Sequence, residues 1–154
     1  MMKKLFIFLM LLTSIKVQAQ IYYVAPNANG GGSSWSDAGD LETMLSLAPD
    51  GAQVWVMHGL YNIGSSIVID RSLSVYGGFE GNENTLEERV LITHNYSILN
   101  SAQTAISSML CVNVDPYLGV HPITNISHFK LDGFYFWNAC IPGWGGAFSL
   151  NIPI

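Results

Sequence analysis

Three short hydrophobic runs, separated by Gly, Ser, Asn and Asp, dominate the stretch from Gln53 to Gly81. The runs are Val54–Met57, Ile67–Ile69 and Leu73–Val75, and they are rich in β-branched and aromatic residues, which favour strands. The segments between them are too short for the helix of a βαβ crossover. The pattern therefore predicts short strands, covered on more than one side and joined by tight corners.

Such strands can bury their apolar sides if the chain coils so that strand stacks on strand. We therefore predict an all-β fold, a parallel β-helix, in which each turn of the solenoid is one rung. Further strands are expected at Ile98-Leu99, over Ile106–Val114 and over Ile126–Phe136, with a corner at Gly133.

One amphipathic helix is predicted over Asp40–Ala48. Asp40 is a good N-cap and Pro49-Asp50-Gly51 ends the helix. We expect the helix to cap the open end of the solenoid, and a partner-binding helix is the alternative. Its apolar face is formed by Leu41, Met44, Leu45 and Ala48.

Alternation in the later strands places aromatic residues on one face. Phe134, Phe136 and Phe148 are expected to stack in the interior, since alternate residues on a strand point the same way. An aromatic row that faced outward would instead be a platform for sugar rings.

The first nineteen residues have the anatomy of a signal peptide. Lys3 and Lys4 precede the apolar run Leu5–Leu12, and Val17-Gln18-Ala19 supplies small residues for cleavage after Ala19. We expect an exported protein that meets the membrane only during export. A retained membrane anchor is the alternative, although the apolar run is short for a span.

Export would leave a strongly acidic chain. After cleavage, Arg71, Arg89 and Lys130 stand against eleven acidic residues, which is a net charge of −8. Such a surface repels nucleic acid and anionic lipid, so neither is an expected partner.

Several short motifs lie along the chain, namely Tyr22-Tyr23-Val24-x-Pro26, Gly31-x-Ser33-Ser34-Trp35, Leu41, Val54-Trp55-Val56-x-x-Gly59-x-Tyr61, Tyr76-Gly77-Gly78-Phe79-x-Gly81, Leu131-Asp132-Gly133-Phe134 and Gly145-Gly146-Ala147-Phe148. Together they resemble the start of secreted right-handed parallel β-helix proteins of the pectin-lyase-like type from Bacteroidetes, and they are similar to repeats of chlamydial polymorphic outer membrane proteins.

The resemblance implies a right-handed solenoid and export, and it leaves activity open because that family contains lyases, hydrolases and adhesins. Gly77 and Gly78 are expected at a rung corner, both with positive φ. Residues with an expected structural role are Trp35, Trp55, Gly59, Tyr61, Gly77, Gly78, Phe79, Gly81, Gly133 and Phe134.

Candidate catalytic groups are sparse in the sequence. Lyases of the family that the chain resembles use Ca²⁺ held by clustered carboxylates, with a Lys or Arg as base. In this sequence the acidic residues are not clustered in that way. Glu83, Glu87 and Glu88, with Arg89, are expected in a solvated loop or short helical turn. We predict no catalytic residue and no cofactor.

No metal site is predicted either, because His58, His94, His121 and His128 lack metal-binding spacing. The Gly-rich loop Asn27–Ser34 lacks the lysine and spacing of a phosphate cradle, and Trp35 is expected to pin it to the body.

Cys111 and Cys140 fall in successive predicted rungs. A disulfide is allowed in an exported chain, and two buried free thiols are the alternative.

The sequence thus predicts a signal peptide over 1–19 and a single domain over 20–154. Within that domain, a cap covers 20–52 and rungs cover 53–154, and the solenoid is expected to continue past Ile154 or to associate end to end. The expected function is surface binding or adhesion, with carbohydrate or another cell-surface ligand as partner. The alternative is the N-terminal part of a polysaccharide lyase or glycoside hydrolase.

Overall fold

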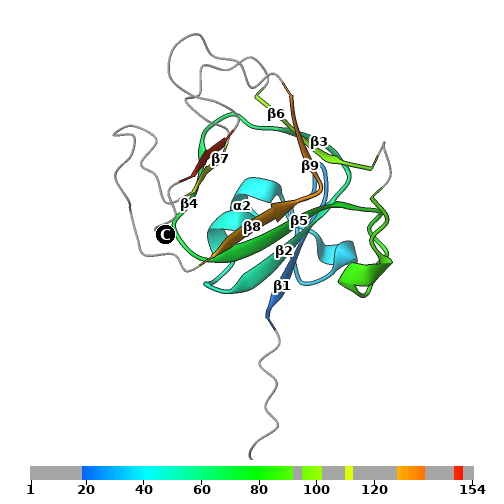
Figure 1. Cartoon of the computed structure of the whole chain (residues 1–154). Coiled ribbons are helices and arrows are strands. Elements are labelled where there is room, and N and C mark those ends of the chain that lie inside the picture. Colours follow the sequence, from blue (N-terminus) through cyan, green and yellow to red (C-terminus); the bar gives the residue numbers. More distant parts are fainter. Residues whose placement is uncertain (1–18, 92–94, 102–109, 113–127, 138–147, 151–154) are drawn as a thin grey trace, which may run out of the picture.

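The computed structural model describes residues 19–91, 95–101, 110–112, 128–137 and 148–150. The described chain consists of short strands and three helical segments (Figure 1). The strands are β1 (Ile21–Val24), β2 (Ala52–Met57), β3 (Gly59–Asn62), β4 (Ile67–Ile69), β5 (Leu73–Phe79), β6 (Ser97–Asn100), β7 (Leu110–Val112), β8 (Phe129–Asp132), β9 (Phe134–Trp137) and β10 (Phe148–Leu150), and the helical segments are η1 (Trp35–Asp37), α2 (Leu41–Leu47) and η2 (Leu86–Glu88).

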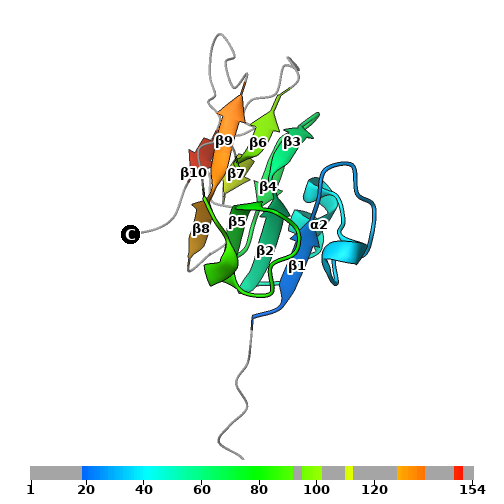
Figure 2. The ribbon, with the colours of Figure 1, turned by 90° about the vertical axis from the view of Figure 1, so that its right-hand side faces the viewer.

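The strands pair in three small sheets, with the orders β1-β2-β5-β8, β3-β6-β9 and β10-β7-β4. Every strand pair is parallel, and Figure 2 shows the strands of β8-β5-β2-β1 and of β9-β6-β3 side by side within each sheet. The strands predicted at Val54–Met57, Ile67–Ile69 and Leu73–Val75 are confirmed, and the last continues to Phe79.

The main core lies between the sheets and α2. Because successive strand residues point to opposite faces, paired strands bring their inward side chains into rows, such as Tyr61, Leu99 and Phe136. Phe134 and Phe136 are half-buried and pack against this core, as predicted. Its buried members include Val24, Leu41, Met44, Leu45, Val54, Val56, Ile63, Ile69, Leu73, Val75 and Leu99.

The predicted helix is confirmed over Leu41–Leu47. The Asp40 carboxylate accepts a hydrogen bond from the Thr43 N–H (2.9 Å), as an N-cap does. At the other end, the Arg71 guanidinium donates to the carbonyls of Ser46 (2.8 Å) and Ala48 (3.2 Å), which satisfies groups that the helix leaves unpaired.

The predicted all-β right-handed parallel β-helix is wrong for the described residues. They form a mixture of small parallel sheets and helical segments with α+β character. No continuous solenoid is evident across the described ranges, which are interrupted at 92–94, 102–109, 113–127 and 138–147.

The position of α2 differs from the predicted one. We expected the helix to cap the end of a core built from strands alone. The apolar face of α2 instead supplies Leu41, Met44 and Leu45 to the same core as the inward residues of the strands. Burying each such side chain stabilises the fold by about 1.5–3 kcal/mol, so the helix is part of the core.

A second buried cluster covers the outer face of the β1-β2-β5-β8 sheet. Trp55 and Phe79 stack with ring centroids 4.7 Å apart, and the Trp35 ring lies 5.4 Å from that of Phe79. Trp35 also donates from Nε1 to the Glu83 carbonyl (2.9 Å). Trp35 therefore pins its loop to the body, as predicted.

The loop after β5 folds over this cluster. Glu83 is 5% exposed, and its carboxylate accepts hydrogen bonds from the backbone N–H groups of Glu80 (2.7 Å), Gly81 (2.9 Å) and Asn82 (3.0 Å). The short helical turn is confirmed as η2, but the predicted solvated loop is wrong for Glu83, because backbone donors replace the water around its charge.

A β-bulge lies at the glycine pair of β5. The pairing with β2 runs from Trp55↔Tyr76 to Met57↔Phe79, which leaves one extra residue in β5. Of the two glycines, Gly78 has positive φ (+83°) and Gly77 does not, so the prediction of positive φ at Gly77 is wrong. Gly77 is needed for close approach instead, since a Cβ there would lie 2.6 Å from the Gly133 carbonyl.

Candidate functional site

The outer face of the β3-β6-β9 sheet carries two rows of side chains. In-register parallel pairing places Leu60, Ile98 and Tyr135 in one row. The second row contains Asn62, Asn100 and Trp137. None of these six residues carries a charge.

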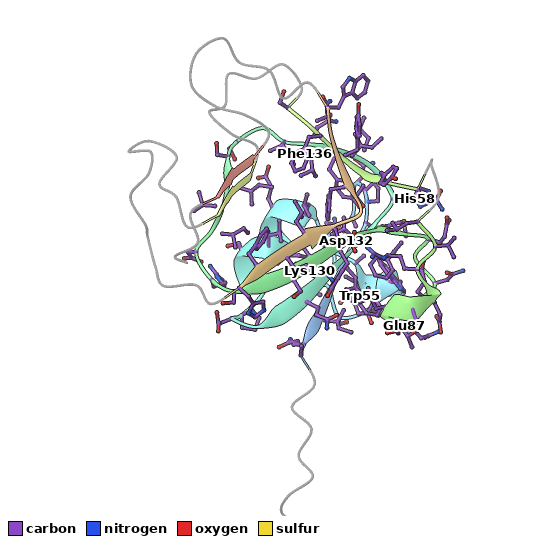
Figure 3. The ribbon with its side chains drawn as sticks, in the orientation of Figure 1. Trp55, His58, Glu87, Lys130, Asp132 and Phe136 are labelled. Atoms are coloured by element: carbon purple, nitrogen blue, oxygen red, sulfur yellow. The ribbon has the colours of Figure 1, made fainter. Side chains whose placement is uncertain are left out.

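Tyr135 and Trp137 are the exposed aromatic pair of this face. They are 57% and 51% exposed, while Phe136 between them points into the core, as Figure 3 shows. Residues two apart on a strand lie about 7 Å from each other on the same side. The two rings thus add uncharged apolar surface to one face, and exposed apolar patches can mark sites of interaction.

Two amides stand beside the Trp137 ring in the same row. Asn100 donates from Nδ2 to the Asn62 Oδ1 (2.8 Å), which fixes the orientation of both side chains. Because its oxygen accepts from Asn100, Asn62 has its NH₂ group as a donor for a ligand hydroxyl. The face therefore combines ring surfaces with oriented hydrogen-bonding groups.

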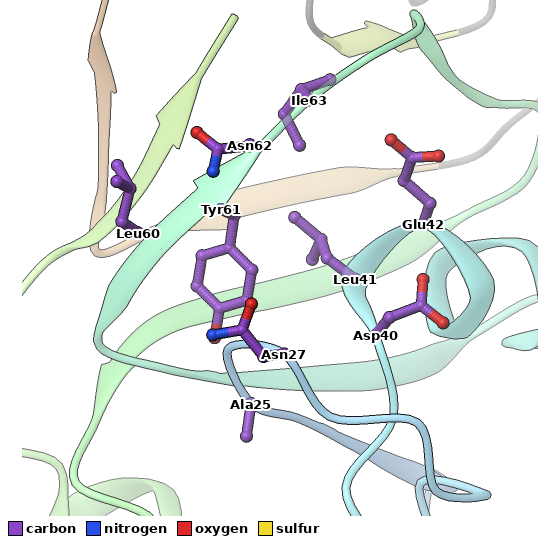
Figure 4. A pocket seen from close by; sticks show the side chains of 9 residues that line it. All are labelled: Ala25, Asn27, Asp40, Leu41, Glu42, Leu60, Tyr61, Asn62 and Ile63. Atoms are coloured by element: carbon purple, nitrogen blue, oxygen red, sulfur yellow. The ribbon is translucent and has the colours of Figure 1, made fainter. Parts of the chain in front are cut away.

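The first strand of this sheet also borders a hollow of about 230 Å³ between β3 and the start of α2 (Figure 4). Figure 4 shows Asn27, from the loop after β1, beside the Tyr61 ring, with Leu41 and Glu42 of α2 opposite. Leu60 and Asn62 line the hollow as well. The hollow and the exposed face therefore share two residues.

Tyr61 forms a fixed wall of this hollow. Its hydroxyl donates to the Met57 carbonyl (2.8 Å), and its ring is buried. Burial raises the pKa of the Tyr61 hydroxyl well above its ordinary value, so the group stays protonated. Tyr61 therefore offers a neutral, immobile ring surface.

The residues predicted to be structural lie in the cores and at close backbone approaches. Trp55 and Phe79 belong to the second cluster and Tyr61 to the main core. Four of the glycines predicted to be structural have positive φ, namely Gly59 (+139°), Gly78 (+83°), Gly81 (+94°) and Gly133 (+81°).

The three basic residues considered for catalysis have structural partners. Arg71 caps α2 and pairs with Asp70 (2.6 Å). Arg89 donates to the Gly77 carbonyl (2.8 Å) and to the Asp132 carboxylate (2.7 Å).

Lys130 has a different kind of partner. Its Nζ lies 4.9 Å from the centre of the Tyr76 ring, as a cation–π pair does. These contacts give each of the three basic side chains a role in holding the fold.

Metal-binding groups do not converge in the described part of the chain, where no set of three His, Cys, Asp or Glu side chains could hold an ion. His58 lies 3.0 Å from the Phe79 carbonyl through Nδ1, and His128 is exposed. His94 and His121 lie outside the described residues.

The Gly-rich loop is organised by an anion of its own. The Asp37 carboxylate accepts hydrogen bonds from the Gly31 N–H (3.0 Å) and the Ser33 hydroxyl (2.8 Å). The Gly31 bond, followed by those from Ser33, lowers the pKa of Asp37, so the carboxylate is ionised at neutral pH. A phosphate at this loop would meet this negative charge.

Further predictions concern parts of the chain that the structure does not describe. They are the signal segment up to residue 18, the partner role of Cys140 and the inward side chain of Phe148. The backbone of Cys111 pairs in register with Val68 of β4, and the question of a disulfide to Cys140 stays open.

The sequence analysis missed Tyr135, Trp137 and the two asparagines. The signal was present in Phe134-Tyr135-Phe136-Trp137, because placing the two phenylalanines inward places Tyr135 and Trp137 outward. The asparagine row could not be found without the register of β3 against β6.

No protein-family model, curated protein or solved structure matches the chain. In the described residues, no helix is long and apolar enough to span a membrane. The resemblance to secreted β-helix proteins therefore has no support beyond its motifs, and function must be argued from the chemistry of the exposed face.

Proposed function

We propose that this protein is an exported binding or adhesion protein that holds neutral carbohydrate on the outer face of β3-β6-β9. The observation that carries the proposal is the exposed pair Tyr135 and Trp137, which stand on one side of β9 at more than half exposure. Export rests on the N-terminal pattern of two lysines, an apolar run and a cleavage site after Ala19.

The chemistry of the face favours a sugar over other ligands. Sugar rings have apolar C–H faces that pack on aromatic rings and hydroxyl edges that need donors and acceptors. Tyr135 and Trp137 supply the ring surfaces, and the exposed amide of Asn62 lies in the same row as Trp137, held by its bond from buried Asn100.

Charge decides between neutral and anionic carbohydrate. The six side chains of the face are uncharged, and a chain cleaved after Ala19 carries a net charge of −8. Anionic glycans would approach an acidic surface without a basic group on this face to pair with them. Neutral glycans carry no such penalty.

Calorimetric titration with neutral and uronic-acid oligosaccharides tests the proposal. We expect the neutral oligosaccharides to bind and Trp137→Ala to weaken binding at least about tenfold, as loss of an aromatic anchor does. Leu47→Ala is the matched control, because Leu47 is 59% exposed on α2, away from the face, and its loss should leave affinity unchanged.

Two results would overturn the proposal. One is an affinity that Trp137→Ala and Tyr135→Ala leave unchanged. The other is a chain that binds no glycan but forms a dimer that Trp137→Ala breaks in sedimentation experiments, which would make the face an interface between copies.

Export has its own measurement. Mass spectrometry of the protein purified from its natural compartment should find a mature chain that begins near Gln20. An intact Met1 on the folded protein would refute export.

A further inference from the structure

We propose that the outer edge of β8 pairs with the same edge of a second copy of this chain, so that the two β8 strands run antiparallel across a two-fold axis at Leu131. This inference goes beyond carbohydrate binding and does not depend on it. It gives the described body a second interaction surface, and the partner that fits this surface is the chain itself.

The position of β8 in its sheet is the first argument. Within the residues that the structure describes, β8 pairs with β5 along one edge and with no strand along the other. Figure 2 shows β8 and β9 on the side of the body that lies opposite α2. An edge of this kind is a template for a further strand, because its backbone N–H and C=O groups point outward.

The other edge of the same sheet is closed by the chain itself. The Tyr23 N–H of β1 donates to the Gly32 carbonyl (2.9 Å), the Tyr23 carbonyl accepts from the Gly39 N–H (3.0 Å), and the Ala25 N–H donates to the Gly39 carbonyl (3.2 Å). A head-to-tail contact between β8 and β1 of another copy is therefore blocked. The contact of like edges remains, and this is the arrangement of a closed two-fold dimer.

The rows of inward side chains end at the same surface. Val54 and Val75 are 0% and 2% exposed, whereas Leu131, the next residue of their row, is half-buried. Leu99 is 2% exposed, whereas Phe136, the next residue of its row, is half-buried. A second copy that covers these last apolar side chains would stabilise them through the hydrophobic effect.

The charges on β8 select both the partner and the register. Lys130 and Asp132 lie two residues apart on the outer side of the strand, where both stand near the Arg89 and Tyr76 side chains. In an antiparallel pair centred on Leu131, Lys130 of each copy stands opposite Asp132 of the other, with Cβ atoms about 5 Å apart. The edge is thus complementary in charge to itself.

The neighbouring registers are unfavourable. A pair centred on Lys130 or on Asp132 would place that residue opposite its own copy, which brings like charges together. A pair centred between two residues would set outward side chains against inward ones, since a slip of one residue changes the face. Only the pairing centred on Leu131 satisfies both the charges and the apolar rows.

Contacts within one copy already hold the charged groups of this edge. Arg89 donates from Nη2 to Oδ2 of Asp132 (2.7 Å), which orients the carboxylate and leaves its second oxygen to accept a further bond. Lys130 is exposed, so its ammonium group can reach a neighbouring strand. Gly133 comes opposite Phe129 of the second copy in this register, and it has no side chain that would collide with the ring.

Sedimentation velocity of the purified protein at several concentrations tests the inference. We expect a reversible dimer with a dissociation constant of about 1–100 µM, as a small interface gives. Lys130→Glu should raise that constant at least about tenfold, because it converts two opposite-charge pairs into two like-charge pairs. Asp132→Lys should do the same. Glu42→Lys is the control, because it changes the net charge as Asp132→Lys does but lies on α2, away from this edge.

Mixing the two variants tests the register itself. In a dimer of one Lys130→Glu chain and one Asp132→Lys chain, each substituted side chain again faces an opposite charge, and so does each native one. The equimolar mixture should therefore dimerise about as tightly as the wild type. Melting curves check that both variants are folded, because Asp132→Lys also removes the partner of Arg89.

Salt supplies a measurement that does not need the Asp132 variant. Raising the salt concentration to about 0.5 M should weaken the wild-type dimer, because it screens the attraction between Lys130 and Asp132. The same salt should strengthen whatever dimer Lys130→Glu still forms, because it screens a repulsion. Equal salt dependence of the two proteins would contradict the proposed pairing.

Three further results would overturn the inference. The first is a protein that stays monomeric up to about 0.2 mM, well above the expected dissociation constant. The second is a dimer that Lys130→Glu leaves unchanged. The third is a mixture of two folded variants that dimerises no better than either variant alone. A dimer that Trp137→Ala breaks and Lys130→Glu does not would place the interface on the outer face of β9, which contradicts the carbohydrate proposal as well.

Discussion

Two sheets of this protein carry aromatic side chains on their outer faces, and only one of those faces is covered. On β1-β2-β5-β8, Trp55 and Phe79 are buried beneath η1 and the loop after β5. On β3-β6-β9, Tyr135 and Trp137 remain more than half exposed. The two faces thus place the same residue type in opposite environments, one buried and one exposed.

The covered face shows how much structure is needed to bury aromatic rings outside the main core. Trp35 reaches the Glu83 carbonyl, three backbone N–H groups hold the Glu83 carboxylate, and Arg89 spans Gly77 and Asp132. Aromatic rings without such cover stay in contact with water, so they add little to the stability of the fold. Their surface can be buried instead by a bound ligand. The covered face therefore serves folding, and the exposed face is the one on which we propose binding.

Removing the central ring of the covered face should have the largest effect. Phe79 is fully buried and stacks on Trp55, so Phe79→Ala should lower the free energy of unfolding by about 3–5 kcal/mol. Urea denaturation measures this. A loss below about 1 kcal/mol would contradict the view that this face is a second core.

The bulge glycine that positions Phe79 should come next. Gly78 has φ +83°, and a Cβ there would collide with the Asn95 carbonyl oxygen. Gly78→Val should destabilise the fold by more than about 2 kcal/mol, through backbone strain and overpacking. Thermal melting against the variant Gly64→Val is the control, since nothing lies within 4 Å of a Cβ at Gly64.

Removing the charge of the Glu83 carboxylate should destabilise the fold less than Gly78→Val does. Gln at position 83 keeps the shape but offers one acceptor oxygen to three N–H donors, so Glu83→Gln should destabilise by about 2 kcal/mol at pH 7. Glu88→Gln, in the same loop but exposed, serves for comparison.

The effect at Glu83 should depend on pH. Burial tends to raise the pKa of Glu83, but the backbone N–H groups outweigh it and hold that pKa below its ordinary value of 4.5. The contribution of the carboxylate is therefore complete above pH 4.5 and is lost as the pH falls through the lowered pKa. Melting curves of wild type and Glu83→Gln should converge in acid, and a constant gap would contradict the prediction.

The smallest effect on stability should come from the exposed face. Trp137→Ala should change the free energy of unfolding by less than about 0.5 kcal/mol, because the ring is half exposed. A loss as large as that of Phe79→Ala would mean that the ring serves folding, which would remove the contrast between the two faces.

Local sequence patterns predicted the elements of the fold better than their assembly. Hydrophobic runs located β2, β4 and β5, and the cap at Asp40 located α2, because these features depend on neighbours in the chain. The all-β class failed because the sequence pattern does not say whether the apolar face of α2 closes an end or enters the core.

The candidate site was predictable in part. Alternation through Phe134-Tyr135-Phe136-Trp137 divides the aromatics between two faces, and the prediction that the phenylalanines point inward was right. The amide row and the hollow depend on the register of β3 with β6 and on the approach of α2, which are contacts between distant residues. The burial of Glu83 was not predicted, because its hydrogen-bond donors are backbone N–H groups and these leave no signal in the sequence.

The tethering of the loop after β5 has a consequence for resistance to proteolysis. Proteases cut segments that can extend into their active sites, so exposed loop tips are normally the first places to be nicked. The hydrogen bond from Trp35 to the Glu83 carbonyl and the one from Arg89 to the Gly77 carbonyl hold this loop near both of its ends. Limited digestion should therefore spare the bonds between residues 80 and 89, in spite of the polar composition that makes them look vulnerable.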